Sequence, residues 1–143
     1  MEIEGAMKTF EIMEHTADIG IIACGADLKQ AFSHAAEGLF SLIVDLDSVR
    51  EKSVRPVRVS AIDVEMLLAS WLNELIYIFD TEHMVFKRFE IIQITDEHLT
   101  ADCHGEKVNR RRHELKRSVK AATYHKLRVE KDNGYRVQVL FDV

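Results

Sequence analysis

The residues best suited to chemistry lie near the two ends of the sequence. The stretch EHTADIG at residues 14–20 places His15, Thr16 and Asp18 between two apolar stretches, residues 10–13 and 19–24. At the other end, Asp142 and Val143 offer a side-chain carboxylate and a terminal carboxylate. Carboxylates are hard oxygen ligands that suit calcium, magnesium or manganese. One hypothesis is therefore a cation site formed by Asp18, Asp142 and Val143.

Each of these residues also has an ordinary structural explanation. Asp18 could form an Asx-turn with the backbone amides that follow it. His15 could be a core or hinge histidine, and Asp142 could be a solvent-exposed charge. Because spacing alone does not bring Asp18 and Asp142 together, the residue types by themselves favour the structural explanations.

Patterns of other catalytic classes are missing from the sequence. It contains no Ser-His-Asp order, phosphate-binding glycine loop or dinucleotide fingerprint. His98, Cys103 and His104 lack the spacing of a tetrahedral zinc set. The formal net charge of −5 argues against nonspecific nucleic-acid binding as the main function.

The charge is unevenly spread, because residues 107–120 read KVNRRRHELKRSVK with Glu114 as their only acid. This segment is either a solvated surface or a patch for phosphates or an acidic partner. The candidate docking residues are Arg110, Arg111, Arg112, Lys116 and Arg117.

Length and composition predict one domain over residues 1–143. A chain of 143 residues that is 47% hydrophobic can bury a core, and no linker composition divides it. The apolar stretches are shorter than the roughly 18 residues of a membrane span, and MEIEGA lacks the basic and apolar regions of a signal peptide. We therefore expect a cytoplasmic protein without a membrane partner, in which Cys24 and Cys103 are reduced core thiols.

Two helices and seven strands are predicted. Asp27, with Gln30 at the capping-box position, predicts a helix that continues to Ile43, and Asp63 predicts a second helix that ends near Phe79. Alternating or apolar stretches predict strands over residues 8–13, 19–25, 54–61, 85–94, 98–103, 121–130 and 135–141. This order favours an α+β fold with two helices packed on one face of a mostly antiparallel sheet.

The last hairpin sets the position of Asp142. Asn133-Gly134 favours a tight turn, and a two-residue turn would pair Lys131 with Arg136. That register brings Asp142 opposite His125, which makes His125 an accessory candidate, although a bulge would shift the pairing.

Four stretches together resemble the archease family. They are EHTADIGI at 14–21, WLNELIYIFD at 71–80, KAATYHKLRV at 120–129 and the final VLFDV. The resemblance runs from about Met7 to Val143 and leaves residues 1–6 as an extension. It implies a small α+β protein of the strand-helix-strand-strand type.

The resemblance also implies a function. Archeases are protein cofactors of the tRNA-splicing RNA ligase, which joins 2′,3′-cyclic phosphate and 5′-hydroxyl RNA ends with GTP and manganese. Such a protein is not itself the ligase, but promotes guanylylation of the ligase histidine and multiple turnover. RNA and GTP would then be contacted through the ligase, unless the basic segment also touches RNA.

By position, Asp18 and Asp142 resemble the metal-binding acids of the family, and Lys120 matches a functional lysine. His15 and Val143 fall within the motifs. Two alternatives stay open: a metal-dependent phosphoesterase that uses the same acids to activate water, and a general chaperone for RNA-processing enzymes. The first would hydrolyse a cyclic phosphate or nucleotide unaided, and the second would stabilise unrelated clients without metal.

Overall fold

The computed structural model describes residues 9–14 and 18–143, so His15 and residues 1–6 lie outside the described residues. The elements, in chain order, are β1 (Phe10–Glu14), β2 (Asp18–Gly25), α2 (Leu28–Ile43), the short 3-10 helix η1 (Leu46–Ser48), β3 (Ser53–Ser60), α3 (Val64–Glu82), β4 (Met84–Ile94), β5 (His98–Lys107), β6 (Ala121–Lys131) and β7 (Tyr135–Asp142).

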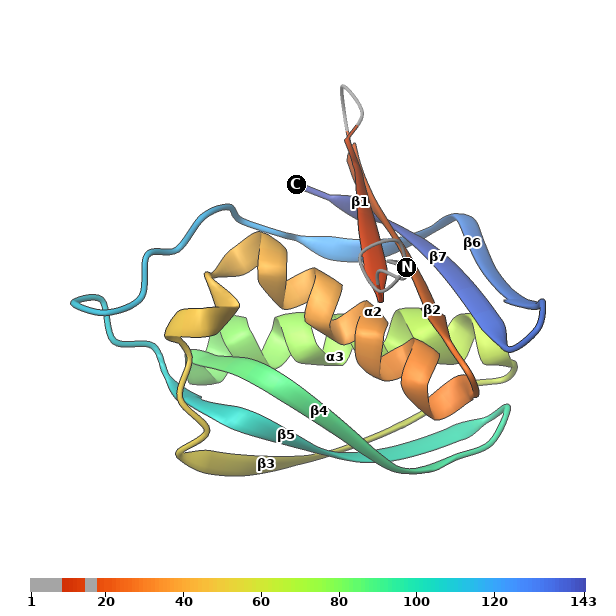
Figure 1. Cartoon of the computed structure of the whole chain (residues 1–143), viewed down its shortest axis with the longest axis horizontal. Coiled ribbons are helices and arrows are strands. Elements are labelled where there is room, and N and C mark those ends of the chain that lie inside the picture. Colours follow the sequence, from red (N-terminus) through yellow and green to blue (C-terminus); the bar gives the residue numbers. More distant parts are fainter. Residues whose placement is uncertain (1–8, 15–17) are drawn as a thin grey trace, which may run out of the picture.

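The described strands form two antiparallel sheets, with strand orders β1-β2-β7-β6 and β3-β5-β4. Both helices lie between the two sheets (Figure 1). The predicted α+β class is confirmed, but the strands divide into two sheets instead of the single sheet expected. Helix α3 buries side chains on more than one stripe, as a helix covered on two sides requires.

Both helices begin at the predicted caps. Asp27 Oδ1 accepts a hydrogen bond from the Gln30 N–H at 2.9 Å, and Asp63 Oδ1 accepts one from the Met66 N–H at 2.8 Å. The Gln30 side chain accepts from the Ala26 N–H at 2.9 Å, one residue before the amide that a capping box uses. Pro56 lies on β3, an edge strand of the three-stranded sheet, where a residue without a backbone N–H is tolerated.

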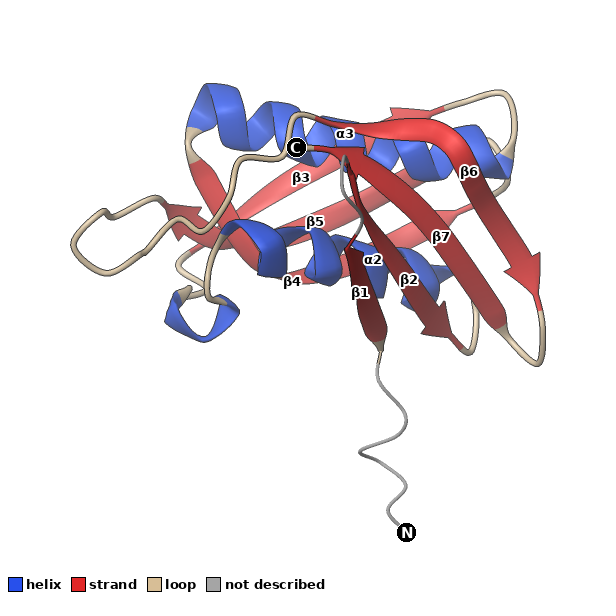
Figure 2. Ribbon diagram, turned by 90° about the horizontal axis from the view of Figure 1, so that it is seen from above, coloured by secondary structure: helices blue, strands red, loops and turns tan. Residues whose placement is uncertain are grey.

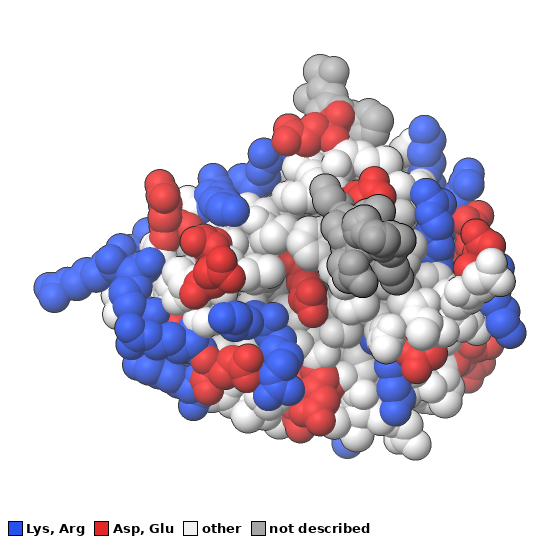
Figure 3. Space-filling model, viewed as in Figure 1, with Lys and Arg blue, Asp and Glu red and all other residues white. Residues whose placement is uncertain are grey.

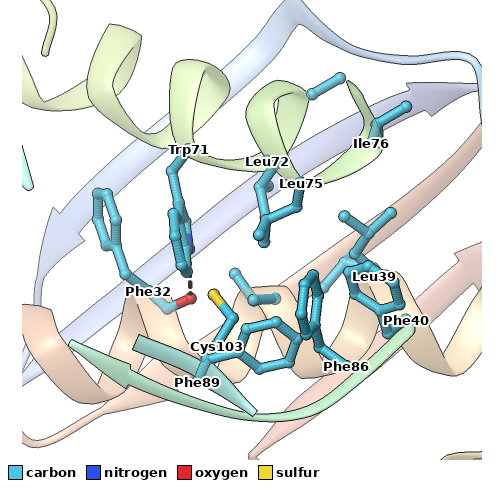
Figure 4. Close-up of a cluster of buried hydrophobic side chains, with 14 of the residues drawn as sticks. Phe32, Leu39, Phe40, Trp71, Leu72, Leu75, Ile76, Phe86, Phe89 and Cys103 are labelled. Atoms are coloured by element: carbon cyan, nitrogen blue, oxygen red, sulfur yellow. Dashed lines mark hydrogen bonds between the residues drawn. The ribbon is translucent and has the colours of Figure 1, made fainter. Parts of the chain in front are cut away.

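The core between the helices and the three-stranded sheet is aromatic (Figure 4). Trp71 is fully buried, and its indole N–H donates to the Phe32 carbonyl at 3.0 Å. Cys103 is buried in the same core, and burial raises the pKa of its thiol to about 12. Cys24 is exposed, so the prediction of two core thiols was wrong for Cys24. Its position alternates with the buried Ala23 and so faces away from the core.

The last hairpin departs from the predicted register. Three residues connect β6 to β7, so Lys131 pairs with Tyr135. The pairing then shifts between Thr123 and Arg128, where Lys126 adopts a left-handed φ of 56°. Asp142 therefore lies opposite Ala121, and the predicted pairing with His125 was wrong. Neither helix of the described chain has the length and apolar character needed to cross a membrane.

Candidate functional site

Asp18 and Asp142 lie opposite each other in the four-stranded sheet. Asp18 begins β2, Asp142 ends β7, and the two are Cα partners in the antiparallel pairing. Directly opposite residues project from the same face, with Cβ atoms about 4.5–5.5 Å apart. The end of β7 lies between the start of β2 and the start of β6 (Figure 2). Two carboxylates from distant parts of the chain thus meet at one end of the sheet.

Apolar alternation fixes this pairing. The next residues, Ile19 and Phe141, are partners 1% and 0% exposed, and Ile21 pairs with the buried Val139 further along. A slip of one residue would turn these side chains out of the core, so the register is strongly specified. Because side chains alternate along a strand, the two acids lie on the face opposite the core.

The acid pair is not neutralised within the described residues. Asp18 Oδ1 is buried without a hydrogen-bond partner among them. A buried polar atom left unpaired costs about 1–3 kcal/mol, and like charges directly opposite each other in a sheet are also destabilising. A hard divalent cation would relieve both costs, so the donor set is compatible with the predicted calcium, magnesium or manganese.

The pair alone does not complete a coordination shell. No group of three or more His, Cys, Asp or Glu side chains gathers within residues 9–14 and 18–143. Val143 follows Asp142 and is 43% exposed. An ion held by Asp18 and Asp142 would need further oxygen ligands, which carbonyls, water or a partner can supply.

Lys120 lies directly beside the acid pair. Its backbone N–H donates to the Asp142 carbonyl at 2.8 Å, and Ala121 is the Cα partner of Asp142. Lys120 is exposed to solvent. The residues that the resemblance selected, Asp18, Asp142 and Lys120, therefore come from three neighbouring strand ends. His125 is exposed in the part of β6 that is not paired with β7, away from this end.

Asn73 positions the start of β6 and was missed from the sequence. Its side chain donates to the Ala122 carbonyl at 3.2 Å and accepts from the Ala122 N–H at 2.8 Å. This two-point contact attaches the start of β6, which directly follows Lys120, to α3. The only sequence signal was a polar side chain within the largely apolar WLNELIYIFD stretch.

The basic segment after β5 is anchored by Glu106, which is only 4% exposed. Arg112 donates to both carboxylate oxygens of Glu106 at 2.7 and 3.1 Å, and the Arg50 N–H donates at 2.8 Å. His113 Nδ1 accepts from the Asn109 N–H at 2.9 Å, so the ring proton is on Nε2 and donates to Glu106 at 2.9 Å.

The electrostatic result is an ionised Glu106. Burial raises the pKa of Glu106, but hydrogen bonds from Arg112, the Arg50 backbone and His113 outweigh it and hold the pKa at about 2. Arg112 therefore acts as a structural cation. Of the other predicted docking residues, Lys116 Nζ donates to the Ser41 carbonyl at 3.2 Å and Arg117 lies 4.0 Å from the Glu14 carboxylate.

Comparison with known proteins decides the family. The model of the archease protein family matches residues 10–143. The chain belongs to the archease family. Protein archease of Pyrococcus abyssi is 43% identical over 142 residues, covering 96% of this chain and all of that one. Protein archease of Sulfurisphaera tokodaii is 38% identical, with 92% of this chain and 95% of that one covered.

Solved structures agree with the archease fold. The solution structure of protein 1598 of Methanobacterium thermoautotrophicum has a TM-score of 0.78 at 34% identity, covering 96% of this chain and all of that one. A Thermotoga maritima protein, described as an archease and possible chaperone, has a TM-score of 0.64 at 21% identity and supports the fold alone, covering 93% of this chain and 96% of that one. The resemblance carried by the four sequence stretches is thus confirmed at the level of the family.

Proposed function

We propose that this protein activates a GTP- and manganese-dependent tRNA-splicing RNA ligase. It would promote guanylylation of the ligase and multiple turnover, without catalysing the joining itself. Membership of the archease family supports the class of activity. The observation that carries the proposal is the Asp18–Asp142 pair, in which a buried carboxylate oxygen has no partner among the described residues.

In this proposal the two carboxylates hold a divalent cation at the end of the sheet, with the Val143 carboxylate as a further ligand. The bound ion would supply positive charge that stabilises phosphate oxygens during nucleotidyl transfer. The buried pair Ile19–Phe141 keeps both acids in fixed positions. Lys120, a compact and mobile cation, would contact a phosphate or a carboxylate of the ligase.

The test is RNA joining by the cognate ligase, with GTP and manganese, at a ligase concentration well below that of the RNA so that multiple turnover is measured. We expect the wild-type protein to stimulate joining, and Asp18→Asn and Asp142→Asn to abolish stimulation, because each variant removes one carboxylate at nearly constant shape. Asp96→Asn is the matched control, since Asp96 is an exposed acid in the β4–β5 turn.

The outcomes separate the alternatives. Full stimulation by both site variants would refute the acidic site, and no stimulation by the wild type would refute the activator role. Hydrolysis of a cyclic phosphate or nucleotide by the protein alone, lost in Asp18→Asn, would favour the phosphoesterase. Stabilisation of unrelated enzymes that is insensitive to chelator would favour the chaperone.

A further inference from the structure

Two adjoining hollows surround the connection between β5 and β6. The first, of about 750 Å³, is lined by Lys52, Lys107, Arg110 and Arg111 above the Glu106–Arg112 pair. The second, of about 700 Å³, lies between this connection and the end of α3 and is lined by Asp80, Arg110, Lys116 and Arg117, among others. Both share Val108 and Arg110. We call the two together the basic hollows.

Positive charge is concentrated at the basic hollows. Their lining holds seven Lys and Arg residues and two acids, a balance of +5 in a chain whose formal net charge is −5. One of the acids, Glu106, is buried and neutralised by Arg112. Lys and Arg side chains accordingly gather where the β5–β6 connection projects, at the left of the view in Figure 3.

The backbone presents Arg110 and Arg111 at the tip of a compact turn. The Arg112 and His113 N–H groups both donate to the Asn109 carbonyl, at 3.0 and 2.7 Å, and the Asn109 side chain accepts from the Arg111 N–H at 3.0 Å. The contacts of Arg112 and His113 with Glu106 fix the base of the turn. The backbone that presents the two arginines is therefore held in place before any ligand binds.

Three of the five cations that line the first hollow are available, since Arg112 is bound to Glu106 and Lys107 donates to the Glu82 carbonyl. Within residues 9–14 and 18–143, the side chains of Lys52, Arg110 and Arg111 form neither a hydrogen bond nor an ion pair with a protein group. Like charges gathered without an acid repel one another, and a polyanion would remove that repulsion. Arginine also presents a planar set of donors that matches the oxygens of a phosphate in two-point contact.

The lining favours phosphate over an acidic protein segment. Val108 is the only apolar residue in the lining of the first hollow. Protein partners rely on buried apolar or aromatic anchors at the centre of an interface. The second hollow also has Phe79 and Leu115 in its lining, so the preference for phosphate rests on the first hollow. Because Arg110 lines both hollows, the two adjoin at a cation, and a phosphate backbone bound in the first could extend towards the second.

We propose that the basic hollows bind the phosphate backbone of single-stranded RNA. The proposal rests on the proposed function for the choice of RNA, the substrate of the ligase, and assigns this protein a direct RNA contact of its own. The site is separate from the Asp18–Asp142 pair, since neither acid lines either hollow.

The test is fluorescence anisotropy with a labelled single-stranded RNA of about 20 nucleotides, without ligase, with chelator, and from about 50 to 200 mM salt. We expect wild-type binding to weaken with salt. Arg110→Ala/Arg111→Ala should lower affinity about fivefold at the lowest salt, as loss of two exposed charge contacts predicts. The negative slope of log K against log salt should become shallower by about 1.4, because two phosphate contacts are lost.

The matched control is Lys29→Ala/Lys131→Ala, which removes the same charge from exposed positions outside both hollows. Its affinity and slope should stay within twofold of wild type, and thermal unfolding should confirm that both double variants are folded. No binding of RNA by the wild type at low salt, or an equal loss in the control, would overturn the proposal.

Two further outcomes keep the proposals apart. If Arg110→Ala/Arg111→Ala binds RNA like the wild type but no longer stimulates the ligase, the hollows dock a protein and the RNA proposal is wrong. If the wild type binds RNA through these arginines but does not stimulate the ligase, the activator role fails alone. Asp18→Asn should bind RNA normally in chelator.

Discussion

Glu106 is a buried carboxylate and Asp18 has one buried carboxylate oxygen, but their surroundings differ. Glu106 accepts four hydrogen bonds, two from Arg112 and one each from the Arg50 N–H and His113. Asp18 Oδ1 has none from the described residues, and another acid, Asp142, is its cross-strand partner.

The contacts of Glu106 stabilise the fold, whereas Asp18 is proposed to bind a cation. A satisfied buried acid holds structure together, and here it anchors the connection that carries the basic hollows. An unsatisfied acid oxygen opposite a second acid costs stability, and a bound cation, as proposed above, would offset that cost. Four predictions test whether the two carboxylates differ as described.

Removing Glu106 should have the largest effect. Glu106→Ala leaves the guanidinium of Arg112 and the Nε2–H of His113 without their acceptor, so we expect the free energy of unfolding to fall by about 3 kcal/mol. Urea unfolding measures this. Glu114→Ala, at an exposed acid of the same connection, should change stability by less than about 0.5 kcal/mol. Equal losses of stability in Glu106→Ala and Glu114→Ala would show that Glu106 does not anchor this connection.

The pH dependence of stability should report the same carboxylate. The pKa of Glu106 is lowered from 4.5 to about 2, so its contribution is present above pH 4.5 and is lost as pH falls towards 2. Between these limits, the stability advantage of wild type over Glu106→Gln should shrink by up to about 3 kcal/mol. A constant difference over this pH range, in urea unfolding, would contradict the prediction.

Asn73 should link stability to the acid pair. Asn73→Ala removes both hydrogen bonds to Ala122, for an expected cost of about 1–2 kcal/mol. Because these bonds fix the start of β6 beside Asp142, amide exchange at Ala122 should accelerate and ligase stimulation should fall. Gln93→Ala, at an exposed amide, is the control. Unchanged exchange at Ala122 would show that β6 does not need this anchor.

Replacing Asp18 should have the smallest effect on the free energy of unfolding, and it should stabilise the protein where the other substitutions destabilise it. In chelator, Asp18→Asn should stabilise the protein by a few tenths to about 1 kcal/mol, because it removes repulsion from Asp142. Wild type should gain in melting temperature when calcium or manganese is added, and Asp18→Asn should not. Asp96→Asn should gain as wild type does. Destabilisation of Asp18→Asn in chelator would mean that the acid is satisfied in the apo protein.

Local signals were enough to predict the helices and most strands. Asp27 and Asp63 cap the helices because a side-chain oxygen reaches an amide three residues ahead, an interaction contained within one turn. The division into two sheets was not predictable in this way. It depends on β2 pairing with β7, which are separated by most of the chain.

The site could be predicted only in part. The types of Asp18 and Asp142 suggested oxygen ligands, but their meeting came from the family resemblance and not from spacing. The register error began at the three-residue turn and grew at the irregularity between Thr123 and Arg128. Lys126, which has a left-handed backbone there, gives no sequence signal of the kind that glycine gives. Arg112 looked like a free cation because Glu106, its partner, resembles any surface acid when read alone.

The pairing of β2 with β7 also determines when the acid pair can form during synthesis of the chain. Synthesis proceeds from the amino end at about 5–20 residues per second, so Asp18 is made well before its cross-strand partner. A nascent chain that still lacks β7 has one edge of β2 open and cannot hold the acid pair. The acid pair can therefore form only after β7 has been synthesised, so pairing of Asp18 with Asp142 would report that the four-stranded sheet has been completed.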